Sequence, residues 1–191
     1  MMDAMQDPLI RALWIAWGLY WLIAARGTKA STRVESSASR ASHLVPLAIA
    51  ALLLWLRTPP DCFLCGRILP ATSTTYFSGV AVIAVGLAFS IWARVHLGRN
   101  WSGVVTLKEN HELVRSGPYA LVRHPIYTGL LLGFVGTAIA RGEWRGVLAV
   151  AMAFVALWRK LRLEERWMIE TFGDAYLRYR AEVAALIPFL L

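Results

Sequence analysis

Residues 126–161 read IYTGLLLGFVGTAIARGEWRGVLAVAMAFVALWRKL, and this stretch decides the fold. Two apolar runs, 126–140 and 144–161, are separated only by the short connection GEWRG at 142–146. Each run is a little shorter than the roughly 20 residues that a helix needs to cross a bilayer core. Two helices joined by so few residues must pair antiparallel. The sequence therefore predicts an antiparallel hairpin of membrane-crossing helices.

Three further apolar runs precede this hairpin, at 9–25, 45–56 and 76–96, and the third is the most hydrophobic. Pro46 fits the first turn of the second run, where its missing N–H does no harm. The chain is 58% hydrophobic with a mean hydropathy of +0.52, which is typical of a small polytopic membrane protein. We therefore expect an all-α integral membrane protein of about five transmembrane helices.

Small residues mark one face of the first hairpin helix. Gly129 and Gly133 form a GxxxG pattern, and Gly136 follows on nearly the same face. Small residues at this spacing let a neighbouring backbone approach closely, so we expect a tightly packed helix against this face.

The segment after the hairpin, EERWMIETFGDAYLRYR at 164–180, has the pattern of an amphipathic helix. Apolar side chains recur at helical spacing, at Met168, Phe172, Ala175, Tyr176 and Tyr179. Gly173 is expected to weaken or kink this helix. We expect a C-terminal amphipathic helix at the membrane surface, folded against the polar segment before residue 126.

The distribution of basic residues predicts the orientation. The chain has 20 Lys+Arg against 12 Asp+Glu, a formal net charge of +8. The basic residues concentrate in 26–42, in 97–125 and in the C-terminal tail, which places the N-terminus outside and the C-terminus in the cytosol. Basic loops in such a protein contact the lipid bilayer, and since no base-reading motif occurs, nucleic acid is not expected as a partner.

Two polar segments resemble a known family. They are HELVRSGPYALVRHPIYTG at 111–129 and LRLEERWMIETFGDAYLRYR at 161–180. The motifs H-x-L-V, G-P-Y, R-H-P-x-Y-x-G, E-E and F-G-x-x-Y-x-x-Y resemble the isoprenylcysteine carboxyl methyltransferase family and its phospholipid N-methyltransferase relatives, over about residues 95–188. The resemblance implies methyl transfer from S-adenosylmethionine, with S-adenosylhomocysteine as product. It also implies a lipophilic or prenylated acceptor, with residues 1–95 shaping its pocket and 96–191 binding the cofactor.

The residues themselves support such a site. Arg123 and His124 can donate to a carboxylate, and Pro125 begins a helix whose N-terminal N–H groups point toward the same anion. Antiparallel pairing brings His124 level with Glu164, which supplies acceptors. No GxGxxG occurs, so the usual nucleotide-binding fold is not expected. The expected cofactor-binding residues are His111, Glu112, Leu113, Val114, Tyr119, Arg123, His124, Pro125, Ile126, Tyr127, Glu164 and Glu165, the first four as the wall for adenine that the resemblance implies.

The acceptor decides what further chemistry is needed. A carboxylate is already anionic, so the site mainly aligns the reactants and excludes water, with a cation to hold the acceptor. Lys160, Arg159 and Arg162 are candidates for that cation. An amine would instead need a base, and a glutamate could serve. The expected catalytic residues are Lys160, Arg162 and Glu164.

Other functions remain open from the sequence. An NADPH-dependent membrane reductase of the sterol type has a similar C-terminal part, although such enzymes are much longer. Cys62 and Cys65 could form an exterior disulfide or serve a thiol oxidoreductase. Two cysteines exclude a four-thiolate zinc site within one chain, and no metal is expected. A non-catalytic scaffold is a further alternative.

Overall fold

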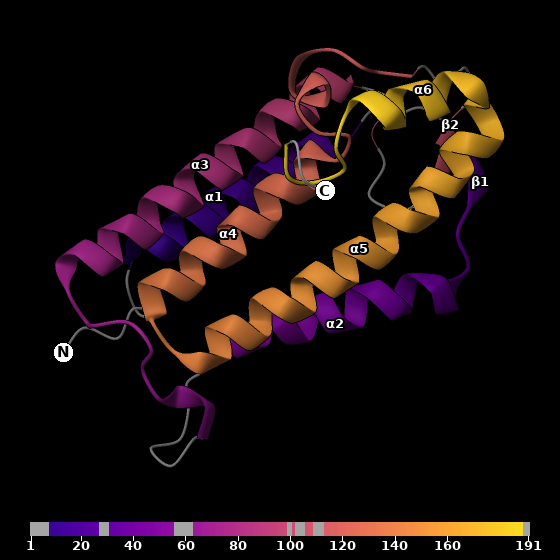
Figure 1. Cartoon of the computed structure of the whole chain (residues 1–191). Helices are drawn as coiled ribbons and strands as arrows, with labels where there is room; N and C mark the ends of the chain where they lie inside the picture. Colours follow the sequence, from indigo (N-terminus) through magenta and orange to yellow (C-terminus); the bar gives the residue numbers. More distant parts are fainter. Residues whose placement is uncertain are drawn as a thin grey trace.

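The computed structural model describes residues 8–26, 31–55, 63–98, 101, 106–108 and 113–188 of the chain. Long helices dominate this part, as predicted (Figure 1). They are α1 (Pro8–Ala24), α2 (Ser37–Trp55), α3 (Ser73–Leu97), α4 (Pro125–Arg141), α5 (Trp144–Phe172) and the shorter α6 (Asp174–Glu182). Two helical turns, η1 (Phe63–Cys65) and η3 (Gly117–Ala120), and an antiparallel strand pair, β1 (Ser31–Val34) with β2 (Thr106–Lys108), complete it. The sequence analysis did not anticipate the strand pair.

Helix α2 begins earlier than predicted. It starts at Ser37 rather than near residue 45, so Pro46 lies inside the helix and its predicted place in the first turn was wrong. The side chain of Ser36 accepts a hydrogen bond from the backbone N–H of Ser39 at 3.2 Å, which caps the helix at this earlier point. The apolar pattern could not show this start because the first turns of α2 are polar.

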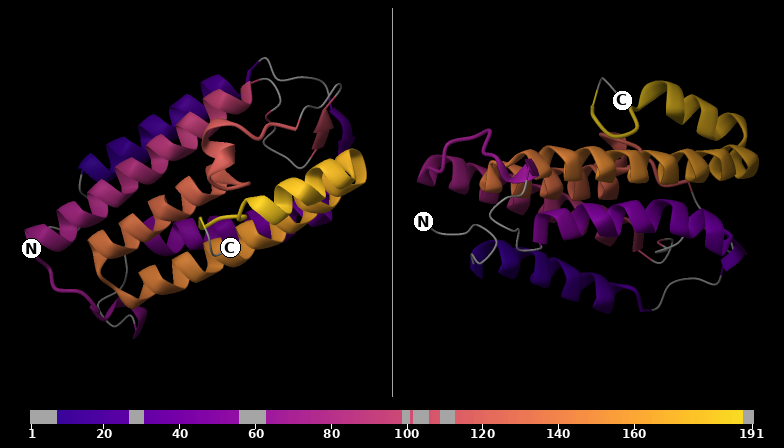
Figure 2. Two further views of the ribbon diagram at one scale, coloured as in Figure 1. Left: turned by 45° about the horizontal axis from the view of Figure 1, so that its top comes forward. Right: turned by 90° about the horizontal axis from the view of Figure 1, so that it is seen from below.

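Helix α5 is longer than predicted. The prediction of a separate amphipathic helix at 164–180 was wrong for the first half of this segment. Residues 164–172 continue α5, because Arg, Glu and Met are good helix formers. Gly173, with a φ of 50°, ends α5, and only α6 folds back (Figure 2). The Tyr179 hydroxyl donates to the Tyr119 carbonyl at 2.5 Å, so α6 packs against the segment before α4, as predicted.

The glycine face of α4 packs against α3. A Cβ atom built on Gly136 would lie 2.5 Å from the carbonyl oxygen of Gly79, and one built on Gly86 would lie 2.6 Å from that of Gly129. The two backbones are therefore in direct contact, and the predicted close approach is confirmed. Helix α1 runs beside this pair (Figure 1), where the Trp17 indole N–H donates to the Ser90 hydroxyl at 2.7 Å.

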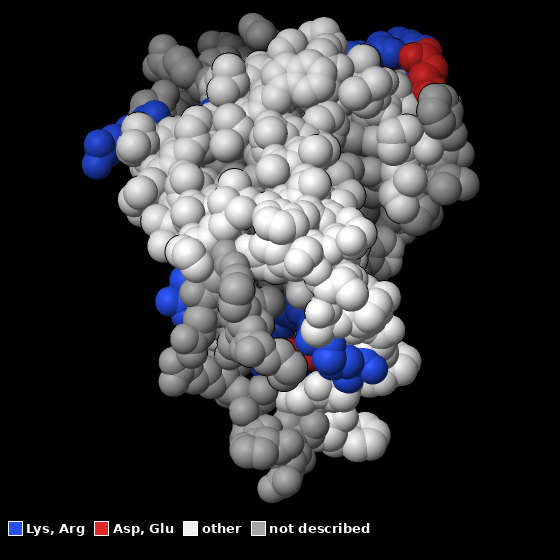
Figure 3. Space-filling model, turned by 90° about the vertical axis from the view of Figure 1, so that its left-hand side faces the viewer, with Lys and Arg blue, Asp and Glu red and all other residues white. Residues whose placement is uncertain are grey.

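The described helices differ in their fitness to cross a membrane. By length and composition α2 and α3 can span one, and α1 and α4 are shorter apolar helices. The 144–161 stretch of α5 carries Arg145, Arg159 and Lys160. Figure 3 shows a broad central area of uncharged residues on one face of the molecule. On α1 the side chains of Ile15, Leu19, Leu22 and Ile23 are each more than half exposed, which fits a lipid-facing surface.

Candidate active site

The start of α4 and the charged end of α5 meet, as the antiparallel hairpin predicted. His124 is the residue immediately before α4. Its Nδ1 lies 3.6 Å from Oε2 of Glu164, and its Nε2 lies 3.5 Å from Oε1 of Glu165. One imidazole is thus placed between two carboxylates from successive residues of the neighbouring helix.

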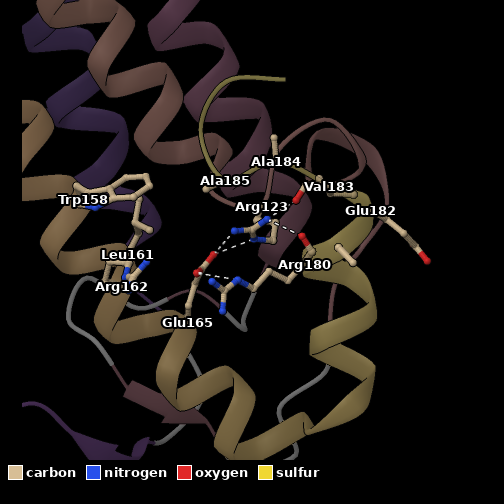
Figure 4. Close-up of a pocket in the computed structure, with 11 residues that line it drawn as sticks. Arg123, Trp158, Leu161, Arg162, Glu165, Arg180, Glu182, Val183, Ala184 and Ala185 are labelled. Carbon is tan, nitrogen blue, oxygen red and sulfur yellow. Dashed lines mark hydrogen bonds and ion pairs between the residues drawn. The ribbon is translucent and has the colours of Figure 1, made fainter. Parts of the chain in front are cut away.

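Arg123 makes a buried ion pair with Glu165 (Figure 4). Its Nε and Nη2 donate to Glu165 Oε1 at 2.8 and 2.6 Å, and the two side chains are only 8% and 5% exposed. Its Nη1 donates to the carbonyl oxygens of Arg180, at 3.2 Å, and of Val183. Most N–H groups of this guanidinium are therefore engaged within the chain, and Arg123 ties α5 to the C-terminal segment.

The segment after α6 lies across the start of α4. The backbone N–H groups of Arg123 and His124 donate to the carbonyls of Ala184 and Ala185 at 2.8 and 3.0 Å. The Thr128 hydroxyl donates to the Leu186 carbonyl at 2.7 Å. These three bonds hold the C-terminal segment as one wall of the site.

A second set of contacts lies around Glu164. The Tyr127 hydroxyl donates to Glu164 Oε1 at 2.5 Å. The Tyr127 ring is parallel to the His124 ring, with 5.5 Å between centroids and 1° between planes. The Lys160 ammonium lies 5.3 Å from the centroid of the same tyrosine ring. Glu164 therefore faces Tyr127 and Lys160, whereas Glu165 faces Arg123.

The electrostatics of the site favour charged side chains. The end of α5 carries a dense run of charge from residue 159 to 166, so this end lies outside the apolar part of the hairpin. Burial alone raises the pKa of Glu165, but the adjacent His124 and Arg123 outweigh burial and lower that pKa to about 2. Burial alone lowers the pKa of His124, but Glu164 and Glu165 outweigh it and raise that pKa. The two carboxylates thus favour the imidazolium form of His124, and His124 and Arg123 favour the ionised form of Glu165.

A cavity of about 360 Å³ opens beside the ion pair (Figure 4). This volume falls within the range of small-molecule sites. Its lining combines an aromatic and an aliphatic wall, three arginines, two carboxylates and a run of C-terminal backbone: Trp158, Leu161, Arg123, Arg162, Arg180, Glu165, Glu182, Ala181, Val183, Ala184 and Ala185. Such a lining suits an amphiphilic ligand that carries both charges.

The structure brings together some of the predicted site residues. Arg123, His124, Tyr127, Glu164 and Glu165 form one network, with Lys160 beside it and Arg162 in the cavity wall. Buried Pro125 begins α4 as predicted, and half-buried Ile126 follows it.

Of the remaining predicted residues, the three that the structure describes, Leu113, Val114 and Tyr119, do not line the cavity. Tyr119 is parallel to His96, at 6.3 Å between ring centroids, and receives the bond from Tyr179. Leu113 and Val114 are half-buried and do not line the cavity. His111 and Glu112 lie outside the described residues.

The sequence analysis missed two parts of the site, Arg180 and the wall at 183–186. Arg180 Nε lies 3.8 Å from Glu165 Oε2. A signal for it was present, because Arg180 directly follows the second tyrosine of the F-G-x-x-Y-x-x-Y motif. The wall at 183–186 contributes backbone carbonyls, which no side-chain pattern reveals.

The cysteine loop lies at the other end of the hairpin. Cys65 is disulfide-bonded, and Cys62 lies outside the described residues. The neighbouring Gly66 carbonyl accepts from the N–H of Trp144, the first residue of α5, at 3.1 Å. Within the described part of the chain no group of three or more His, Cys, Asp or Glu could hold a metal ion.

Comparison with known sequences identifies relatives of the chain. The model of the family described as phospholipid methyltransferase matches residues 74–175. The protein-S-isoprenylcysteine O-methyltransferase of Schizosaccharomyces pombe is 32% identical over 119 residues, covering 59% of this chain and 49% of the relative. Isoform A of Arabidopsis thaliana is 36% identical over 118 residues, covering 59% and 58%. The human enzyme of the same name is 28% identical over 155 residues, covering 78% and 53%. The chain thus spans about half the length of these curated relatives.

Comparison with solved structures identifies the fold. The structure of the eukaryotic intramembrane Ras methyltransferase ICMT, an isoprenylcysteine carboxyl methyltransferase, superposes with a TM-score of 0.55 at 21% sequence identity. The match covers 98% of this chain and 70% of that one. The similarity therefore includes the N-terminal helices, which lie outside the residues that the family model matches.

Proposed function

Since the chain belongs to the phospholipid methyltransferase family, we propose that it is an integral membrane enzyme that transfers a methyl group from S-adenosylmethionine to a lipophilic carboxylate, such as that of an isoprenylcysteine. The observation that carries this proposal is the cavity beside the buried Arg123–Glu165 pair and His124. The three curated relatives named above are all isoprenylcysteine O-methyltransferases, which favours a carboxylate acceptor.

The cavity residues fit S-adenosylmethionine. The cofactor carries a carboxylate, an ammonium, a sulfonium and an adenine ring. Arg162 and Arg180 can bind the carboxylate, Glu165 can accept from the ammonium, and the ring of Trp158 offers a face to adenine or to the sulfonium. The Nε2 of buried His124 lies 3.5 Å from Oε1 of Glu165, so the imidazole helps to hold this carboxylate, which lines the cavity.

The chain's own residues then bind and orient the cofactor. When bound, the cofactor supplies an electrophilic methyl group on a sulfonium. The neutral thioether that remains is a good leaving group and needs no acid. Glu165 stays ionised beside Arg123 and can fix the amino acid end of the cofactor, while the backbone at 183–185 lines the cavity next to it. A carboxylate acceptor is already the nucleophile, so no base is required. Glu164 is left to orient Tyr127 and Lys160 rather than to remove a proton.

We further propose that α1 to α5 all cross the bilayer, with the N-terminus outside and the site at the cytosolic face. Residues 1–95 form the pocket for the acceptor chain, and residues 96–191 bind the cofactor. The basic segments 26–42 and 97–125 support this orientation, because their strands β1 and β2 lie at the end of the molecule that carries α6 (Figure 1). A prenylated acceptor reaches the site from within the bilayer.

The proposal is tested by methyl transfer in membranes that contain the chain. Radiolabelled S-adenosylmethionine is supplied with N-acetyl-S-farnesylcysteine, which ends in a carboxylate, or with phosphatidylethanolamine, which ends in an amine. We expect the label to appear in N-acetyl-S-farnesylcysteine. Treatment with base should release this label as methanol, since base hydrolyses a methyl ester but not an N-methyl group. Label in neither acceptor, with stabilisation of the purified chain by NADPH but not by S-adenosylhomocysteine, would support the reductase alternative instead.

A further inference from the structure

A second buried pair of ionisable side chains lies near the site and is not used by the proposed mechanism. Glu35 and His43 are only 6% and 4% exposed, and Nε2 of His43 lies 3.5 Å from Oε1 of Glu35. Ionisable side chains this deeply buried are uncommon unless they are paired, because burial of charge is costly. The pair precedes residues 74–175, which the family model matches, so it belongs to a part of the chain that this model does not specify.

The packing of α2 on α5 determines what this pair faces. Ala50 and Leu54 of α2 pack with Ala149 and Ala153 of α5, and the two helices run side by side (Figures 1 and 2). Because they are antiparallel, moving back along α2 means moving forward along α5. Two further turns bring His43 level with Lys160. The Arg159 Nε donates to the hydroxyl of Ser42 at 2.6 Å, which fixes this register.

Lys160 connects the pair to the active site. Lys160 and Glu164 are four residues apart on α5 and share one helix face. Both act electrostatically on the imidazole of His43. The Lys160 ammonium also lies over the ring of Tyr127, whose hydroxyl donates to Glu164. Lys160 is therefore close enough to interact electrostatically with His43 on one side and lies over Tyr127, the partner of Glu164, on the other.

Arg162 lies on the opposite side of α5. Two positions along a helix are about 200° apart, so Lys160 and Arg162 point in nearly opposite directions. Arg162 lines the cavity together with Glu165, whereas the Lys160 ammonium lies over the ring of Tyr127, which donates to Glu164. The end of α5 thus offers one cation to each side of the Glu164–Glu165 pair.

Two carboxylates take part in the proposed reaction, one on the cofactor and one on the acceptor, and each needs a cation. We infer that Lys160 binds the acceptor carboxylate and that the Glu35–His43 pair positions Lys160, so that this pair selects acceptors ending in a free carboxylate. This inference rests on the proposed function. Glu35 holds His43 in place on α2, and His43 fixes the wall against which the flexible lysine chain lies. Arg162 is left for the cofactor.

The selectivity for charge distinguishes this role from a merely structural one. We compare N-acetyl-S-farnesylcysteine as substrate with its carboxamide as competitive inhibitor, in the wild type and in Lys160→Met, Lys160→Arg, His43→Gln and Glu35→Gln. Lys160→Met should raise KM for the carboxylate about tenfold or more, because a charge-assisted hydrogen bond is lost, and leave the inhibition constant of the carboxamide within about twofold. Lys160→Arg should restore most of the lost affinity. His43→Gln and Glu35→Gln should raise the same KM with little change in kcat.

Binding of S-adenosylhomocysteine serves as the internal control, with Arg166→Met as a matched variant. Arg166 is exposed on the same helix, so its substitution should change neither the KM for the carboxylate nor the inhibition constant of the carboxamide. All variants should bind S-adenosylhomocysteine within about twofold of the wild type. Equal losses of carboxylate, carboxamide and S-adenosylhomocysteine affinity, or unchanged KM in Lys160→Met, would overturn the inference. A wild-type chain that binds no S-adenosylhomocysteine would instead contradict the proposed function.

Discussion

Three side chains, Arg123, His124 and Glu165, carry the account at the scale of single residues. Their mutual contacts are buried, and removing one partner of a buried ion pair costs about 3–5 kcal/mol because the other charge remains uncompensated. The same contacts lower the pKa of Glu165 to about 2 and raise the pKa of His124, so they favour the charged form of each. The network therefore supports the fold and presents charges to the cavity.

The protonation of His124 predicts a pH-dependent stability. Because its pKa is raised above the usual 6.5, protonation stabilises the fold fully below pH 6.5, and this contribution is lost as the pH rises through the raised pKa. The lowered pKa of Glu165 acts in the acid range, where stability is lost as the pH falls from 4.5 toward about 2. We expect the unfolding temperature of the wild type in detergent to exceed that of His124→Gln most at about pH 6 and less at about pH 9. Each kcal/mol of lost stability should lower the unfolding temperature by roughly 2–4 °C. A difference that grows with pH would contradict this protonation state.

The sequence could predict that His124 lies level with Glu164, because this follows from the short hairpin connection. It could not predict that Arg123 would be occupied by Glu165 and by two carbonyls. Those partners depend on α6 folding back, and that turn depends on the backbone of Gly173. The position of Arg180 near Glu165 could not be predicted for the same reason, because Arg180 lies on α6.

At the scale of elements, the closest contact is the backbone packing of α3 on α4. A Cβ on Gly86 would lie 2.6 Å from a backbone oxygen and 2.6 Å from the Cβ of Leu132, and neither atom belongs to a flexible side-chain end. We expect Gly86→Ala to destabilise the chain by about 2–3 kcal/mol, measured by thermal unfolding in detergent. Gly18→Ala on α1 is the matched control, since nothing lies within 4 Å of its Cβ. Equal stability of the two variants would show that the helices are not in such contact.

Gly173 sets the turn from α5 into α6. Its φ of 50° and ψ of −127° are accessible to glycine and strained for other residues, while open space surrounds the position. We expect Gly173→Ala to cost about 1–3 kcal/mol and to weaken binding of S-adenosylhomocysteine, because α6 carries Arg180. Titration calorimetry measures the second effect, and Gly18→Ala again provides the comparison. Full affinity in Gly173→Ala would mean that the position of α6 does not matter for the cofactor.

The element boundaries show where sequence patterns end. The apolar runs located α1, α3 and α4 to within a few residues, since hydrophobicity marks a membrane-facing helix. The same pattern missed the polar first turns of α2, which begin at a serine cap, and the charged last turns of α5. Helices extend beyond their apolar part wherever capping and propensity allow, and hydropathy does not report either.

At the scale of the whole molecule, the two ends of the bundle are chemically different. The site lies at one end, with Arg123, His124 and the end of α5. The η1 turn and the connection between α4 and α5 lie at the other, joined by the bonds of Ile68 N–H and Leu69 N–H to the Gly142 carbonyl at 2.7 and 3.2 Å. A membrane would separate these two ends.

This separation predicts accessibility to a membrane-impermeant thiol reagent. In a Cys62→Ser/Cys65→Ser background, a cysteine replacing the 95%-exposed Phe63 should react from outside intact cells. A cysteine replacing exposed Arg178 on α6 should react only after the membrane is opened. Labelling of both positions in intact cells would show that the ends are not on opposite sides.

The central claim is that the antiparallel hairpin builds a cofactor site from Arg123, His124 and Glu165. Titration calorimetry of S-adenosylhomocysteine with the purified chain in detergent tests it most directly, comparing the wild type, Glu165→Gln and Glu170→Gln, with Glu170 exposed on the same helix. The account predicts saturable binding to the wild type and to Glu170→Gln, and an affinity at least about tenfold weaker in Glu165→Gln. Equal affinities for all three proteins, or no binding to the wild type, would contradict it.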